Sequence, residues 1–93
     1  MIASARVETP DAAGLAVRMA NHFGHKVPVE RSEGEVRIEL PTAVARISVQ
    51  ADALALRVEA DEEAGLARGE QVVASHLERF VRGAPVTVSW SRA

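Results

Sequence analysis

The chain has 93 residues, no cysteine and a formal net charge of −2, with 47% hydrophobic residues but only 3% aromatic ones. This length predicts one domain, the lack of cysteine excludes disulfides and thiolate chemistry, and interleaved charges of both signs disfavour nucleic acid as a partner. No apolar run is long enough to span a membrane, and residues 1–10 lack the pattern of a signal peptide, so we expect a cytoplasmic protein with no membrane partner.

A strand, a helix and a second strand are predicted in the first third of the chain. Residues 2–8 alternate between small apolar and polar side chains, which is typical of a strand with one buried face. Thr9 and Pro10 then favour a helix start with Thr9 as N-cap, and apolar residues recur at three- to four-residue spacing. That stripe consists of Ala12, Leu15, Ala16, Met19 and Phe23. Gly24 and Pro28 end the helix, and the proline also favours a strand start or an edge strand.

Three more strands are predicted in the middle of the chain. Residues 35–40, 45–50 and 54–59 each alternate between apolar and polar side chains, and short turns separate them. Strands joined by tight turns are antiparallel, and alternation buries only one face of each. We therefore expect an antiparallel sheet with one apolar face.

A second helix and a last strand are predicted in the final third. Acidic residues 61–63 lie at the positive end of the helix, and Gly83 is expected to cap its other end. Its apolar stripe consists of Leu66, Val73, Leu77 and Phe80. Residues 86–91 alternate again, which predicts a strand with Trp90 facing the core.

The element order is therefore β-α-β-β-β-β-α-β within a single domain, residues 1–93. Two helices with one apolar stripe each are available to cover the apolar face of the sheet. The predicted fold is a two-layer α+β sandwich with both helices packed on one face. Because aromatic residues are few, loss of Phe80 should cost about 3–5 kcal/mol.

Three histidines are the candidates for a metal site or an acid–base cluster. Helical angles place His22 at the flank of its stripe, His25 toward solvent and His76 largely buried. One hypothesis is that the three imidazoles meet across the two helices and bind a transition metal. The alternative is that His76 is a core histidine with a hydrogen-bond partner, while His25 and Lys26 complement the negative helix end. No carboxylate at matched spacing completes a metal site, which favours the alternative.

Two other features of the second helix bear on function. Ser75 precedes His76, but adjacent helical residues point about 100° apart and cannot act as nucleophile and base. Gly65 and Gly69 each cost about 1 kcal/mol relative to alanine in a helix. Close approach of the first helix or of a ligand would offset that cost, or the glycines are simply tolerated.

Two segments resemble a known bacterial family. Residues 22–29, HFGHKVPV, and residues 72–80, VVASHLERF, resemble the signatures of the domain of unknown function 2218 family. The similarity runs nearly end to end, from an opening strand that ends in Thr9 and Pro10 to a final strand that carries Trp90. The matching motif positions are His22, Phe23, His25, Lys26, His76, Arg79 and Phe80. Family members have no established activity. Some are associated with siderophore-interacting flavoproteins, so the resemblance implies a link to iron or siderophore handling.

The chain departs from the family pattern in two places. Residues 40–45, LPTAVA, lack the glycine and the cysteine of the family's aromatic-Pro-aromatic-Gly-x-Cys stretch. Residues 81–84, VRGA, replace the usual aromatic and acidic residues. The chain therefore lacks the side chain on which any role of that cysteine would depend.

Three hypotheses for function follow. The first is a non-catalytic binding or accessory module linked to iron–siderophore metabolism, with a siderophore or a siderophore-interacting protein as partner and no cofactor other than a metal on the histidines. Its tentative ligand-binding residues are His22, His25, Lys26, His76 and Arg79, where Lys26 and Arg79 would supply charge for an anionic siderophore. The second is a small enzyme with His76 as general base. The third is a structural homodimer that pairs through the exposed sheet face or an edge strand.

Overall fold

The computed structural model describes residues 1–81 and 86–93. In these residues the elements follow the predicted order. They are β1 (Ile2–Glu8), α1 (Ala12–Gly24), β2 (Val29–Ser32), β3 (Glu35–Leu40), β4 (Ala43–Val49), β5 (Ala53–Glu59), α2 (Glu63–Phe80) and β6 (Ser91–Arg92). The predicted cap at Gly83 lies outside the described residues.

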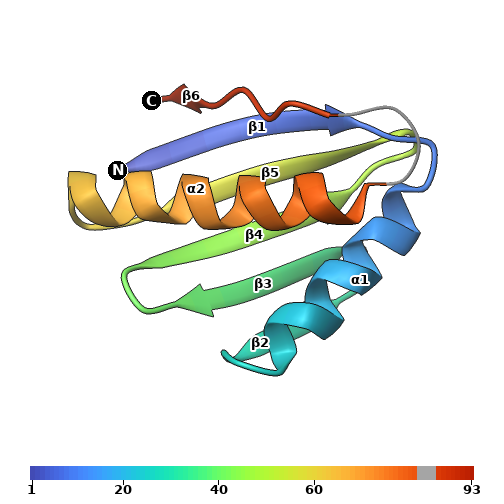
Figure 1. Ribbon diagram of the computed structural model, residues 1–93, viewed down its shortest axis with the longest axis horizontal. Helices are drawn as coiled ribbons and strands as arrows, with labels where there is room; N and C mark the ends of the chain where they lie inside the picture. Colours follow the sequence, from blue (N-terminus) through green and yellow to red (C-terminus); the bar gives the residue numbers. More distant parts are fainter. Residues whose placement is uncertain (82–85) are drawn as a thin grey trace.

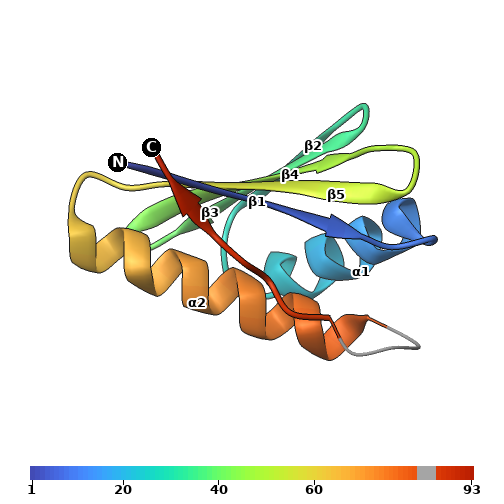
Figure 2. The same ribbon diagram turned by 90° about the horizontal axis from the view of Figure 1, so that it is seen from above.

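The strands form one antiparallel sheet in the order β2-β3-β4-β5-β1-β6. Strands β2 to β5 follow one another as a meander. The first strand, β1, pairs with the far edge of this meander at β5, with Ile2 opposite Glu59 and Glu8 opposite Ala53. Figures 1 and 2 show both helices on the same face of this sheet. The two-layer α+β sandwich predicted from the sequence is confirmed.

The core lies between the sheet and the two helices, where the alternating strands and the helical stripes meet. Its largest fully buried side chains are Leu15, Met19, Ile38, Ile47, Leu54, Leu56, Val58, Leu66, Val73 and Leu77. Phe23 is also buried, at 5% exposed, whereas Phe80 is only partly buried and packs against the outside of this core. The prediction that Phe80 is a principal core residue is therefore wrong. Its position as the last residue of α2 explains this, since no further helical turn covers it.

The start of α1 differs from the prediction. The helix begins at Ala12 with Asp11 as N-cap, and Asp11 makes no side-chain capping bond. Thr9 instead donates its backbone N–H to the Asp52 carbonyl at 2.9 Å, which extends the pairing of β1 beyond its last strand residue. The Asp11 carboxylate lies 3.3 Å from the Arg18 guanidinium. Thr9 therefore belongs to the end of the strand, and the predicted N-cap is two residues too early.

The last strand is shorter than predicted. Only Ser91 and Arg92 pair with β1, while residues 86–90 lie outside the ladder. Val88 donates its backbone N–H to the Glu78 carboxylate of α2 at 3.4 Å, so this part of the segment is held by the helix and not by the sheet. The alternation is nevertheless real, because every second side chain packs against the core. These side chains are Val86, Val88 and Trp90.

Arg92 fixes the chain end to the helix layer. Its guanidinium donates two hydrogen bonds of 3.0 Å to the Glu70 carboxylate and a third to Glu63. These bonds raise the pKa of Arg92 above its usual range. The segment is thus anchored to β1 through its backbone and to α2 through one side chain.

Helix α2 lies unusually close to the sheet at two glycines. A Cβ atom at Gly65 would lie 2.5 Å from the Thr42 carbonyl oxygen, and one at Gly69 would lie 2.6 Å from Cγ1 of Val58. The close approach expected of these glycines is therefore to the sheet, and not to the first helix or a ligand. Among the described residues, no helix is both long enough and apolar enough to cross a membrane.

Candidate functional site

The two motif histidines on different helices face each other across the gap between α1 and α2. The ring centroids of His22 and His76 are 4.9 Å apart, with 44° between the ring planes. Phe80 lies 5.1 Å from His22, and Phe23 lies 4.8 Å from His76. Both recognisable sequence motifs therefore contribute to one aromatic contact between the helices.

His76 is oriented by its own helix. It is partly buried, not largely buried as predicted, and its Nδ1 lies 2.7 Å from the Val72 carbonyl oxygen. A carbonyl oxygen only accepts, so Nδ1 carries the proton and donates it, which leaves Nε2 for another partner. The Ser75 hydroxyl also donates to the Val72 carbonyl, at 3.3 Å. Ser75 therefore makes no nucleophile–base pair with His76, as its helical position indicates.

Three further basic residues lower the pKa of His22. His25 and Lys26 are exposed at the end of α1, and Arg79 is exposed on the last turn of α2. Partial burial is the main reason why the pKa of His22 lies below its ordinary value of 6.5, and the positive charges of His76, Lys26, Arg79 and His25 lower it further. We call these five residues, His22, His25, Lys26, His76 and Arg79, the basic cluster. The permanent charges of Lys26 and Arg79 make the surface around His22 favourable for an anion.

The three histidines do not meet as one set of metal ligands in the part of the chain that the structure describes. Within residues 1–81 and 86–93, no group of three or more His, Cys, Asp or Glu side chains is arranged to hold a metal ion. His22 and His76 approach each other, but His25 at the exposed end of α1 does not complete a set with them. The chemistry that this arrangement favours is therefore the attraction of negative charge by the basic cluster.

The lowered pKa of His22 predicts a pH dependence of stability. Because the folded pKa is below the unfolded one, the unfolded chain binds more protons between these two values. The contribution of His22 to the free energy of unfolding is then fully present above about pH 6.5 and is lost as the pH falls below it. Urea unfolding at several pH values should show a smaller acid-side decline for His22→Gln than for the wild type. His25→Gln is the control and should keep most of the decline; equal slopes for wild type and His22→Gln would contradict the prediction.

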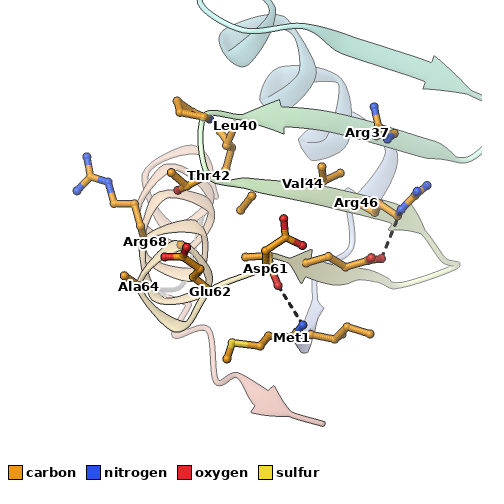
Figure 3. Close-up of a pocket in the computed structure, with 16 residues that line it drawn as sticks. Met1, Arg37, Leu40, Thr42, Val44, Arg46, Asp61, Glu62, Ala64 and Arg68 are labelled. Atoms are coloured by element: carbon orange, nitrogen blue, oxygen red, sulfur yellow. Dashed lines mark hydrogen bonds and ion pairs between the residues drawn. The ribbon is translucent and has the colours of Figure 1, made fainter.

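A pocket of about 940 Å³ lies at the opposite end of α2, between the start of that helix and the β3–β4 turn. Figure 3 shows Arg37 and Arg46 on the strands, while Arg68 on the helix points away from them. Arg37 pairs with Glu39 at 2.6 Å and Arg46 pairs with Glu35 at 3.2 Å. None of the five predicted site residues lines this pocket. Arg37 and Arg46 are already paired with carboxylates, and three acidic residues, Glu59, Asp61 and Glu62, also line the pocket, so its lining is less favourable for an anion than the basic cluster.

Sequence reasoning missed a second, smaller hollow next to the basic cluster. It has a volume of about 610 Å³ and lies where α1 ends and β2 begins. His25 lines it together with Asn21 and Arg31, which lie outside the motif residues selected from the sequence. The sequence motif HFGHKVPV indicates part of this hollow, because its residues Val27 and Pro28 belong to the lining. No sequence signal marks Asn21 and Arg31, because these two residues come together only when α1 and β2 lie side by side in the fold.

Comparison with known proteins finds one family and one similar solved structure. Residues 4–91 match the family described as "Uncharacterized protein conserved in bacteria (DUF2218)". The NMR structure of PA4090 from Pseudomonas aeruginosa is similar, with 26% sequence identity and a TM-score of 0.81 over 97% of this chain and 94% of that one. No curated protein matches. These similarities support the fold and leave the site to be interpreted from its own residues.

Proposed function

Because the chain belongs to the DUF2218 family of uncharacterised bacterial proteins, its function has to be inferred from its own site, and we propose that it is a non-catalytic module that binds a small anion at the basic cluster. The observation that carries this proposal is geometric: the contact between His22 and His76 joins the ends of α1 and α2, where the two exposed cations Lys26 and Arg79 lie. Gathering like charges on a folded surface costs free energy unless a counter-charge is bound. An anionic ligand would supply that counter-charge.

The proposed ligand is a siderophore that carries carboxylate or catecholate groups. Lys26 and Arg79 are exposed and therefore free to approach an anion in solution. The imidazoles of His22 and His76, beside Phe80, add an aromatic surface against which a planar ring can pack. The partner class comes from the family resemblance, and a siderophore-interacting protein that presents such a ligand is the corresponding protein partner.

Binding is tested by calorimetry and by amide NMR titration with a ferric catecholate, ferric citrate and sulfate. We expect shifts at the basic cluster, and we expect Lys26→Gln and Arg79→Gln each to weaken binding about fivefold, since an exposed charge pair contributes up to about 1 kcal/mol. Arg57→Gln is the matched control, because Arg57 is an exposed arginine paired with Glu59 on the uncovered sheet face. Sulfate separates general anion binding from recognition of an iron complex. No heat and no shift with any of the three anions would refute the proposal.

One observation favours an enzymatic alternative, in which His76 is a general base. Its Nδ1 donates a hydrogen bond to the Val72 carbonyl oxygen, so Nε2 is the nitrogen that would accept a proton from a substrate. His76 lines neither the pocket at the start of α2 nor the hollow beside His25. If an activity is found, His76→Gln should abolish it; retention of full turnover by that variant would eliminate the alternative.

A homodimer through the uncovered sheet face is disfavoured by the charges on that face. Arg37, Arg46 and Arg57 lie directly opposite one another on β3, β4 and β5, with glutamate partners around them. Covering such a network with a second copy would remove several charges from water, and their desolvation would offset much of the gain. Light scattering over a range of concentrations distinguishes a monomer from a dimer.

A further inference from the structure

The hollow beside His25 differs from the rest of the basic cluster because it combines charge with an apolar wall. Val27, Pro28 and Val29 form part of its lining as the chain passes from the end of α1 into β2. Val27 and Val29 are partly buried, and Pro28 is exposed. A ligand in the hollow would therefore cover apolar surface that water now contacts.

The polar part of the hollow favours a carboxylate. Arg31 donates a hydrogen bond to Oδ1 of Asn21, so the guanidinium is held at the hollow and the amide N–H groups of Asn21 remain available as donors. His25 adds a third potential donor. No aspartate or glutamate belongs to the described lining, so no carboxylate there competes with a ligand for these donors. The lining thus offers donors to an anion on one side and aliphatic contacts on the other.

We propose that this hollow binds the carboxylate and the adjoining short aliphatic chain of an amphipathic carboxylic acid. The proposal rests on the proposed function insofar as His25 belongs both to the hollow and to the basic cluster. It specifies the ligand further, because a bare anion would leave the apolar wall uncovered. The aliphatic chain packs against Val27 and Pro28 while Arg31 and Asn21 bind the carboxylate.

The test is an amide NMR titration of the wild type with acetate, butyrate and sulfate at constant ionic strength. Butyrate should bind about tenfold more tightly than acetate, because it buries two more methylene groups. The shifts should centre on Asn21, His25 and Arg31. Equal affinities for acetate and butyrate would overturn the proposal.

Gly24 offers a variant that fills the hollow. It lines the hollow, a Cβ atom there meets no heavy atom within 4 Å, and its φ is not positive. Gly24→Leu should therefore fold normally, remove the preference for butyrate over acetate and leave the sulfate shifts at Lys26 and Arg79 in place. Preserved preference in a folded Gly24→Leu would overturn the proposal. Arg31→Gln provides an independent check and should weaken both acids about fivefold.

The two proposals fail differently in this experiment. Sulfate shifts at Lys26 and Arg79, without a preference between the two acids, would support the basic cluster and refute the carboxylic-acid hollow. Butyrate shifts at Asn21 and Arg31 without any anion effect at Lys26 and Arg79 would support the hollow and refute the basic cluster. No shift with any probe would refute both.

Discussion

Leu77→Ala should lower the free energy of unfolding by about 3–4 kcal/mol. Leu77 is 0% exposed and belongs to the core cluster that joins α2 to the sheet. Truncation removes the transfer free energy of its buried methyl groups and leaves a cavity. Neighbouring strands cannot close that cavity easily, because β4 and β5 are each held by backbone pairing on both sides. Urea unfolding followed by circular dichroism measures the loss.

Val17→Ala is the matched control for this prediction. Val17 lies on α1 and is 50% exposed, so its truncation removes few contacts. The control should change the free energy of unfolding by no more than about 0.5 kcal/mol. If Leu77→Ala cost as little as Val17→Ala, α2 would not be seated on the sheet as described. The placement of His76 and of the basic cluster would then be wrong as well.

The fold was largely predictable because its strands and helices have unambiguous periods. Most of the apolar side chains predicted to face the core from β3, β4 and β5 are buried, and two, Leu40 and Val49, are partly buried. The buried ones are Val36, Ile38, Ala45, Ile47, Leu54, Leu56 and Val58. Strand order was not predictable, because the pairing of β1 with β5 joins residues at opposite ends of the chain's first two thirds. Alternation predicts a strand over residues 86–91, although only its end pairs with β1, because alternation reports which side is buried. It does not report whether the backbone bonds are made to a neighbouring strand.

The candidate site was predictable at the level of helix faces only. Wheel angles correctly placed His22 at a flank and His25 in solvent. They predicted too much burial for His76, because helical angles do not account for the hydrogen bond between its ring and the Val72 carbonyl oxygen of the same helix. The contact between His22 and His76 depends on how the two helices sit on the sheet, which no local pattern encodes. The same limitation concealed the hollow, which needs Asn21 from α1 beside Arg31 from β2.

Gly65→Ala should destabilise the protein by about 1–2 kcal/mol, although alanine is the better helix former. Helix propensity favours the substitution by about 1 kcal/mol. The new Cβ would, however, lie 2.5 Å from the Thr42 carbonyl oxygen and 3.2 Å from the Thr42 Cβ. Both atoms belong to the β3–β4 turn and cannot rotate away, so the helix or the turn has to shift, which costs about 2–3 kcal/mol, at the upper end of the overpacking range. Thermal unfolding should show a fall of about 4–8 °C for each kcal/mol lost.

Gly24→Ala is the control for this steric argument. Its Cβ meets no heavy atom within 4 Å, so only the propensity gain remains and the midpoint should stay constant or rise. Gly69→Ala should behave like Gly65→Ala, because its Cβ would lie 2.6 Å from Cγ1 of the stiff Val58 side chain. If alanine at position 65 or 69 were as well tolerated as at position 24, α2 would lie farther from the sheet than described. The glycine pair would then mark simple tolerance and not a close helix–sheet contact.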